Sequence, residues 1–212
     1  MRRSSSWVLA AGVVGLLLTA CTSTGVEVTD GEPIGPDGIT TGSIHFDAPE
    51  SWLTFTADTV AAEATDAADA ASLAPFMDRM AEMTGVDPEA LLSDLDEAAF
   101  YAFSPDPPGE DPVGLLSLVE SRTGSPSGQL VTEQLEDEVD GPVDVTPFLT
   151  SDGLLGQRVR YALPGEGTGR WYAVQIHVTA AGVTSIISIV SDRSERDADL
   201  AGDIVAASLT RS

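Results

Sequence analysis

Four segments with strand character follow one another in the last third of the chain, and they constrain its fold more than any other feature. Each is rich in β-branched and aromatic residues and is bounded by turn-forming residues. The four segments are residues 143–149, 154–163, 170–180 and 183–191. The connections between them are short, which favours antiparallel neighbours, so the sequence predicts a β-meander. The fourth segment carries Ile or Val on both faces, which is typical of a central strand covered on both sides.

Further strands and helices are predicted before and after this meander. Apolar runs predict strands at residues 43–47, 51–57, 100–103 and 113–121. The first two are separated by a turn at Pro49, and we expect them to form an N-terminal hairpin. Helical spacing predicts helices over residues 58–83, 87 to about 100, 125–139 and after Ser194, which resembles the start of a capping box. The order predicts an α+β fold, with an antiparallel meander packed between helices.

The first 20 residues have the three parts of a secretory signal. Arg2 and Arg3 supply a basic start, residues 7–18 form an apolar run, and small residues precede Cys21. The run is shorter than the roughly 20 apolar residues that a membrane-spanning helix needs. We therefore expect residues 1–20 to be a signal peptide that is cleaved before Cys21.

The residues Leu18-Thr19-Ala20-Cys21 resemble the lipobox of bacterial lipoproteins. The resemblance implies that Cys21 receives a diacylglyceryl thioether, with acyl chains such as palmitate, and anchors the protein on the extracytoplasmic side of the cell membrane. Residues 21–41 are rich in Gly, Thr, Pro and Asp, which predicts a flexible tether, followed by one domain over residues 42–212. The alternative is an ordinary export signal in which the single Cys falls at this position by chance.

The charge balance disfavours whole classes of function. The chain has 34 acidic and 10 basic residues, with a net charge of −24. A surplus of this size repels phosphate, so we expect no nucleic-acid partner. All ten basic residues are Arg, and the chain lacks Lys and Asn. Schiff-base catalysis and a phosphate-binding P-loop lysine are therefore excluded.

One face of the predicted meander combines polar and aromatic residues. Trp171, Gln175 and His177 alternate with apolar residues along one segment, and Arg158 and Arg160 alternate along the preceding one. We expect the five side chains to share one face as a candidate binding face, where the arginines would accept a carboxylate, phosphate or sulfate. The alternative is that both arginines pair with carboxylates of a helix covering that face.

The sequence predicts no metal site and no cofactor. The two histidines, His45 and His177, stand apart from other ligand types, and Cys21 is assigned to lipid. Two acidic groups lack the spacing of a calcium loop: Asp106, Glu110 and Asp111, and Asp192, Glu195, Asp197 and Asp199. We interpret them as a solvated loop and a capped helix N-terminus.

The order of these features resembles the PsbP-like fold. The similarity lies in the lipobox, the segment Phe46-Asp47-Ala48-Pro49-Glu50-Ser51-Trp52, the acidic helical middle, the meander, and a closing helix that contains Ile204 and Ser208-Leu209. Within that fold the chain is similar to the LpqN/LpqT-type lipoproteins of actinobacteria. The resemblance covers residues 43–210 and implies an antiparallel sheet between helices and a binding or assembly role without catalysis.

The function expected from these observations is that of a lipid-anchored envelope protein without catalytic activity. Its partner would be a membrane protein or an envelope lipid. Two alternatives remain open. One is an envelope hydrolase that uses Asp152 or Glu166 with His177. The other is a solute-capture lipoprotein that feeds a transporter.

Overall fold

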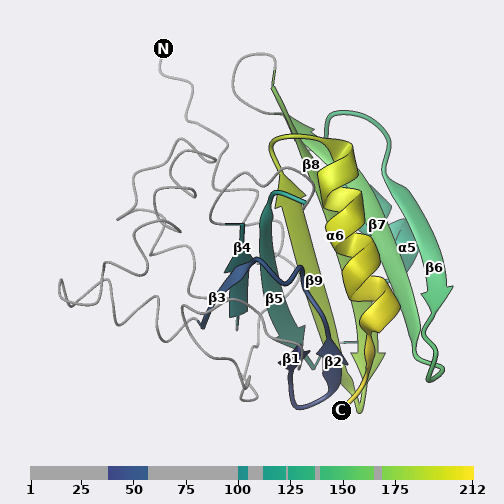
Figure 1. The fold of residues 1–212 in the computed structure, drawn as a ribbon. Coiled ribbons are helices and arrows are strands. Elements are labelled where there is room, and N and C mark those ends of the chain that lie inside the picture. The colour runs from purple at the N-terminus through teal and green to yellow at the C-terminus, as the bar shows by residue number, and fades with distance from the viewer. Residues whose placement is uncertain (1–37, 57–99, 105–111, 123, 137–138, 165–168) are drawn as a thin grey trace, which may run out of the picture.

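The computed structural model of the chain describes residues 38–56, 100–104, 112–122, 124–136, 139–164 and 169–212. Within these residues the chain has an α+β fold, with ten strands in two antiparallel sheets and two helices (Figure 1). None of the described helices is long and apolar enough to cross a membrane. The helices predicted over residues 58–83 and 87 to about 100 lie outside the described residues, except that Phe100 begins a strand.

Seven strands form the larger sheet, in the order β3-β4-β5-β9-β8-β7-β6. Their bounds are β3 Leu53–Thr56, β4 Phe100–Phe103, β5 Leu115–Ser121, β6 Asp144–Leu149, β7 Leu155–Pro164, β8 Arg170–Ala180 and β9 Val183–Ser191. All neighbouring pairs are antiparallel. The predicted meander is confirmed as β6 to β9. The fourth segment is also confirmed as a central strand, since β9 lies between β5 and β8 and is almost entirely buried.

The smaller sheet joins the two ends of the described chain. It contains β1 (Ile39–Thr40), β2 (Ile44–Phe46) and β10 (Thr210–Arg211), with β2 in the middle. The predicted hairpin of the first two strand segments is therefore wrong, because β2 pairs with β1 and β10 whereas β3 pairs with β4. The cause lies in the turn between them. Trp52 is fully buried and its indole Nε1 donates to the Pro112 carbonyl at 3.1 Å, so the chain crosses into the larger sheet instead of folding back.

The predicted tether ends earlier than residue 41, because the first strand lies inside it. β1 lies inside residues 21–41, and its Ile39 side chain is buried in the main core. Gly38 immediately before it has a φ of +63°, and a Cβ there would lie 2.5 Å from Asp47 Oδ1. The described fold therefore begins at residue 38, inside the predicted tether.

Helix α6 (Glu195–Ser208) packs against one face of the larger sheet. Its predicted cap is present, because the Ser194 hydroxyl accepts a hydrogen bond from the Asp197 amide at 3.1 Å. The buried side of the helix consists of small or branched residues, Ala198, Ala201, Gly202 and Val205. These residues close the main core over β8 and β9.

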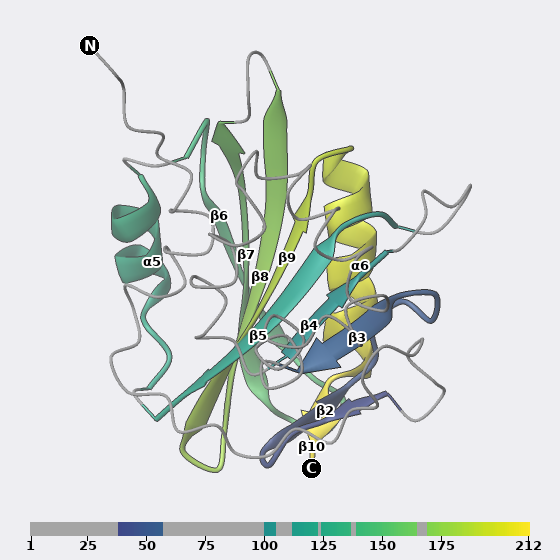
Figure 2. The same cartoon turned by 90° about the vertical axis from the view of Figure 1, so that its left-hand side faces the viewer.

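Helix α5 (Gly128–Leu135) lies on the opposite face of the sheet from α6 (Figure 2). Its Val131 and Leu135 form a second apolar cluster with Val159 and Ala173 of β7 and β8. The helix is shorter than the predicted span of residues 125–139, because Ser127 is its N-cap. Pro126 and Ser127 precede it as non-helical chain.

Candidate functional site

The register between β7 and β8 divides the five predicted binding-face residues between the two faces of the sheet. Arg158 lies directly opposite Ile176, and Arg160 lies opposite Val174. Residues directly opposite each other share a face, and Ile176 and Val174 belong to the core on the α6 side. Trp171, Gln175 and His177 alternate with these core residues and therefore face the other side. The prediction that all five share one face is wrong.

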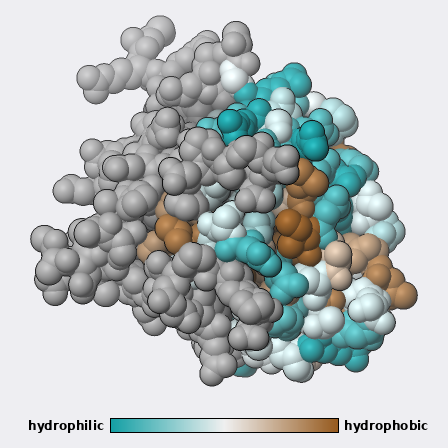
Figure 3. All heavy atoms as spheres, in the orientation of Figure 1, coloured by the Kyte–Doolittle hydropathy of each residue, from teal (hydrophilic) through white to brown (hydrophobic). Residues whose placement is uncertain are grey.

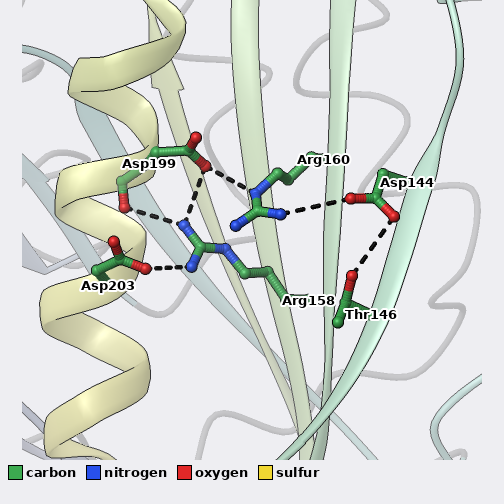
Figure 4. Close-up of polar contacts among 6 residues, drawn as sticks. All are labelled: Asp144, Thr146, Arg158, Arg160, Asp199 and Asp203. Atoms are coloured by element: carbon green, nitrogen blue, oxygen red, sulfur yellow. Dashed lines mark hydrogen bonds and ion pairs between the residues drawn. The ribbon is translucent and has the colours of Figure 1, made fainter.

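Arg158 and Arg160 lie under α6, where they contact carboxylates (Figure 4). Arg158 Nη2 donates to Asp199 Oδ1 at 3.0 Å, and Arg158 Nη1 pairs with Asp203. Arg160 Nε donates to the same Asp199 Oδ1 at 2.8 Å, and its Nη1 lies 3.4 Å from Asp144 Oδ2. The alternative interpretation, in which both arginines pair with carboxylates of a covering helix, is confirmed.

The charges of this cluster disfavour an anionic ligand. Two guanidinium groups meet three carboxylates among the described residues, so the cluster of Arg158, Arg160, Asp144, Asp199 and Asp203 is negative overall. Burial acts to lower the pKa of Arg160, but Asp199 and Asp144 outweigh it, and the pKa is raised. The cluster therefore connects helix to sheet instead of presenting a cationic spot.

The face opposite α6 carries a buried histidine beside a buried amide. His177 is 0% exposed, and its Nε2 lies 3.1 Å from Gln175 Oε1. An amide oxygen only accepts, so Nε2 carries the proton and Nδ1 presents a lone pair. Burial lowers the pKa of His177 to about 4, which keeps the imidazole neutral at pH 7.

Two buried polar atoms on this face have no hydrogen-bond partner in the described part of the chain. They are His177 Nδ1 and Ser188 Oγ. Ser188 of β9 lies directly opposite Gln175 of β8 on one side and Ser117 of β5 on the other. It is therefore a diagonal neighbour of His177 on the same face of the sheet. We call Ser117, Gln175, His177 and Ser188 the polar row. One hydroxyl group, from a ligand or a water molecule, would satisfy both atoms by donating to Nδ1 and accepting from Ser188.

Trp171 shares this face but lies away from the polar row. It packs on the α5 cluster and pairs in register with Leu163. It lies six positions before His177 along β8, which corresponds to about 20 Å in a strand. The structure therefore brings together Gln175 and His177 of the predicted residues. Ser117 and Ser188 were missed because the sequence pattern marks residues 113–121 and 183–191 only as apolar strands.

The structure does not bring Asp152 and His177 together as a hydrolase would require. Asp152 accepts from the Thr150 hydroxyl at 2.5 Å and from the Arg211 amide at 2.7 Å, whereas His177 contacts Gln175. The Thr150 and Arg211 hydrogen bonds, in that order, lower the pKa of Asp152. A histidine with a pKa of about 4 is also a weak base at neutral pH. Glu166 lies outside the described residues.

Metal ligands do not converge within the described residues. No group of three or more His, Cys, Asp or Glu side chains there could hold a metal ion. In the second acidic group, Asp197 accepts from the Ser194 hydroxyl, and Asp199 pairs with both arginines. Cys21 and the group of Asp106, Glu110 and Asp111 lie outside the described part of the chain.

Comparisons with known proteins do not assign the chain to a family. Neither a scan against protein-family models nor a search of curated proteins finds a match to the chain. The resemblance to the PsbP-like fold and to LpqN/LpqT-type lipoproteins therefore depends on the sequence features alone.

Proposed function

We propose that the protein is a lipid-anchored binding protein of the cell envelope, without catalytic activity, held to the membrane through acylated Cys21. We also propose that its fold is a PsbP-like α/β/α sandwich. The fold proposal is supported by the positions of α6 and α5, which pack on opposite faces of one antiparallel sheet. The anchor proposal is supported by the lipobox residues Leu18-Thr19-Ala20-Cys21.

The polar row is the observation that carries the binding role. A fully buried sheet face normally pairs its polar atoms, because an unsatisfied buried group costs about 1–3 kcal/mol. Here a histidine lone pair and a serine hydroxyl, next to apolar Ile186 and Ala173, have no hydrogen-bond partner among the described residues. The pattern suits a ligand that has a hydroxyl-bearing head and an apolar body. Of the two expected partners, a membrane protein and an envelope lipid, it favours the lipid.

Analysis of lipids that co-purify with the acylated protein tests the binding role. His177→Phe replaces the lone pair with an apolar ring of similar size, and Thr179→Val on the same strand and face is the matched control. We expect one lipid class, identified by mass spectrometry, to co-purify with the wild type and with Thr179→Val and to be lost from His177→Phe. A co-purifying membrane protein with the same dependence would make the partner a protein. Equal recovery from all three variants would contradict the proposed site.

The anchor has its own test. We expect wild-type protein in the membrane fraction, with a diacylglyceryl mass on the peptide that begins at Cys21. Cys21→Ser should block both maturation and this modification. A wild-type peptide without lipid mass would refute the anchor and leave the binding site to be judged separately.

A further inference from the structure

Three turns lie together at one end of the molecule, the lower end in Figures 1 and 2. They are Thr41–Ser43 between β1 and β2, Thr150–Leu154 between β6 and β7, and Ala181–Gly182 between β8 and β9. The Arg211 amide donates to Asp152 Oδ2 at 2.7 Å, and the Ser212 hydroxyl donates to the Thr41 carbonyl at 2.9 Å. These bonds join the first two turns through β10. We call this connected region the turn end.

Two leucines at the turn end are exposed side by side. Leu149 and Leu155 lie directly opposite each other where β6 meets β7, and each is 69% exposed. They are the most exposed large apolar side chains of the described residues. Figure 3 shows apolar atoms gathered at the surface over the lower end of β6. An adjacent exposed pair forms a continuous apolar patch, which marks an interaction surface more often than a single exposed leucine does.

The three turns of the turn end themselves carry few acidic side chains. They contain one, Asp152, in a chain that has 34 acidic residues. The opposite end of β9 leads into Asp192, Arg193, Glu195 and Arg196 at the start of α6. Beside these turns, among the described residues, lie exposed Arg211 and the buried Glu120, which accepts a hydrogen bond from Ser43. The leucines therefore stand next to few charged side chains of the described part, and this surface can approach a bilayer without desolvating many charges.

The path of the chain places the proposed anchor on the same side. Ile39 starts β1, which is two residues long, so Gly38 lies within about 10 Å of the Thr41–Ser43 turn. Residues 22–37 separate Cys21 from Gly38, and this length of chain can span at most about 60 Å. An anchor at Cys21 can thus reach a membrane at the turn end without the chain passing around the domain.

We propose that the turn end docks on the lipid bilayer, with Leu149 and Leu155 entering the boundary between head groups and acyl chains. This inference rests on the proposed function, because the acyl chains at Cys21 keep the domain close to the membrane. The docking then sets orientation: β7, β8 and β9 run away from the bilayer. His177, three residues from the end of β8, lies near the lipid head groups, which places the polar row where a lipid ligand enters.

Fluorescence of a single labelled thiol measures this orientation in the full acylated protein. Acylation blocks Cys21, the single Cys of the chain, so an introduced Cys is the only thiol that a maleimide dye labels. Ser151→Cys places an environment-sensitive dye in the β6–β7 turn, and exposed Arg196→Cys places it at the opposite end as a control. Each protein is reconstituted in phosphatidylcholine vesicles that contain doxyl-labelled phosphatidylcholine as the quencher. The intact mass of each sample reports acylation independently.

We expect the dye at position 151 to shift to the blue and to lose most of its fluorescence to the doxyl lipid, while the dye at position 196 keeps its fluorescence. Adding Leu149→Ser and Leu155→Ser to Ser151→Cys should remove the quenching, and circular dichroism should show the fold unchanged because both leucines are exposed. Acylated protein with no quenching at 151, or with equal quenching at both positions, would overturn the docking. A blue shift that depends on protein concentration and resists doxyl quenching would also overturn it, in favour of a second copy. A sample without lipid mass would overturn the anchor and the docking together.

Discussion

Arg158 binds both the side chain and the backbone of Asp199: its Nη2 lies 3.0 Å from the carboxylate Oδ1 and 2.9 Å from the main-chain carbonyl oxygen. This double contact fixes one turn of α6 over β7. The Arg158 side chain is only 11% exposed, and Asp203 one turn further along contacts the same guanidinium. Residues that look like a ligand site in the sequence thus hold a helix on its sheet.

The first prediction concerns the stability that Arg158 contributes. Arg158→Met keeps much of the apolar stem but removes the charge that Asp199 and Asp203 face. We expect the free energy of unfolding to fall by about 2–3 kcal/mol, because a nearly buried charge partner is lost. Arg160→Met is the matched control. Its side chain is 36% exposed, so its loss should cost about 1 kcal/mol or less. Urea unfolding at pH 7 measures both, and equal losses would contradict the assigned role of Arg158.

The second prediction concerns the close approach of α6 to β8. A Cβ on Gly202 would lie 2.8 Å from Val174 Cγ1 and 3.1 Å from Arg158 Nη2. Ala favours a helix over Gly by about 1 kcal/mol, but the clash forces the helix away from the sheet. We expect Gly202→Ala to destabilise the protein by about 1–2 kcal/mol net in thermal or urea unfolding. The exposed Ala207→Gly, in the last turn of the same helix, gives a lower bound on the propensity effect without a packing change. Stabilisation by Gly202→Ala would show that the helix has room to move.

Local patterns were enough to predict most of the larger sheet and α6. Periodicity and turn residues lie within a few positions of one another, so β6 to β9 and the Ser194 cap could be read directly. The pairing of β2 with β10 could not, because it joins Ile44 to Arg211 across almost the whole domain. No local signal specifies such a partner. The buried Trp52 that redirects the chain is likewise a tertiary effect.

The candidate site was predicted in part for a related reason. Alternation within β8 correctly places Gln175 and His177 on one face, but the relation between two strands depends on their register. A register that sets Arg158 opposite Ile176 sends the arginines to the other face. Ser188 joins the site only through its position opposite Gln175. The sequence of one strand therefore shows which of its own side chains share a face. Which residues of different strands meet in one site depends on how the strands pair.

The third prediction is a pH dependence that originates at His177. Burial lowers its pKa to about 4 in the folded protein, against about 6.5 when unfolded, so the unfolded chain binds the proton more readily between these values. Above pH 6.5 the imidazole is neutral in both the folded and the unfolded chain, so His177 does not make the free energy of unfolding depend on pH. As the pH falls from 6.5 to 4, the folded state should lose about 3 kcal/mol relative to a variant that cannot titrate.

His177→Gln provides that variant, since its amide can still donate to Gln175. Urea unfolding at pH 7, 6, 5 and 4.5 gives two stability curves, and their difference cancels the contribution of the many carboxylates. We expect the wild type to lose stability more steeply than His177→Gln below pH 6.5. Parallel curves across this range would mean that the imidazole is hydrated in the folded state.

The last prediction concerns Asp152 and the attachment of β10 at the turn end. The Asp152 carboxylate accepts from the Thr150 hydroxyl and from the Arg211 amide, and these bonds lower its pKa. Asp152→Ala removes the acceptor, so the Arg211 amide should exchange with deuterium several-fold faster at pH 7. The lowered pKa means that the ionised Asp152 stabilises the folded state at pH values above the unfolded pKa of about 3.8. The Arg211 amide of the wild type should therefore lose its protection from exchange only as the pH falls below about 3.8, through the lower pKa of the folded state. Glu195→Ala, an exposed change in the first turn of α6 at the other end of the helix, should leave exchange at Arg211 unchanged. If exchange is equally fast in the wild type and in Asp152→Ala, β10 is held by its pairing with β2 alone.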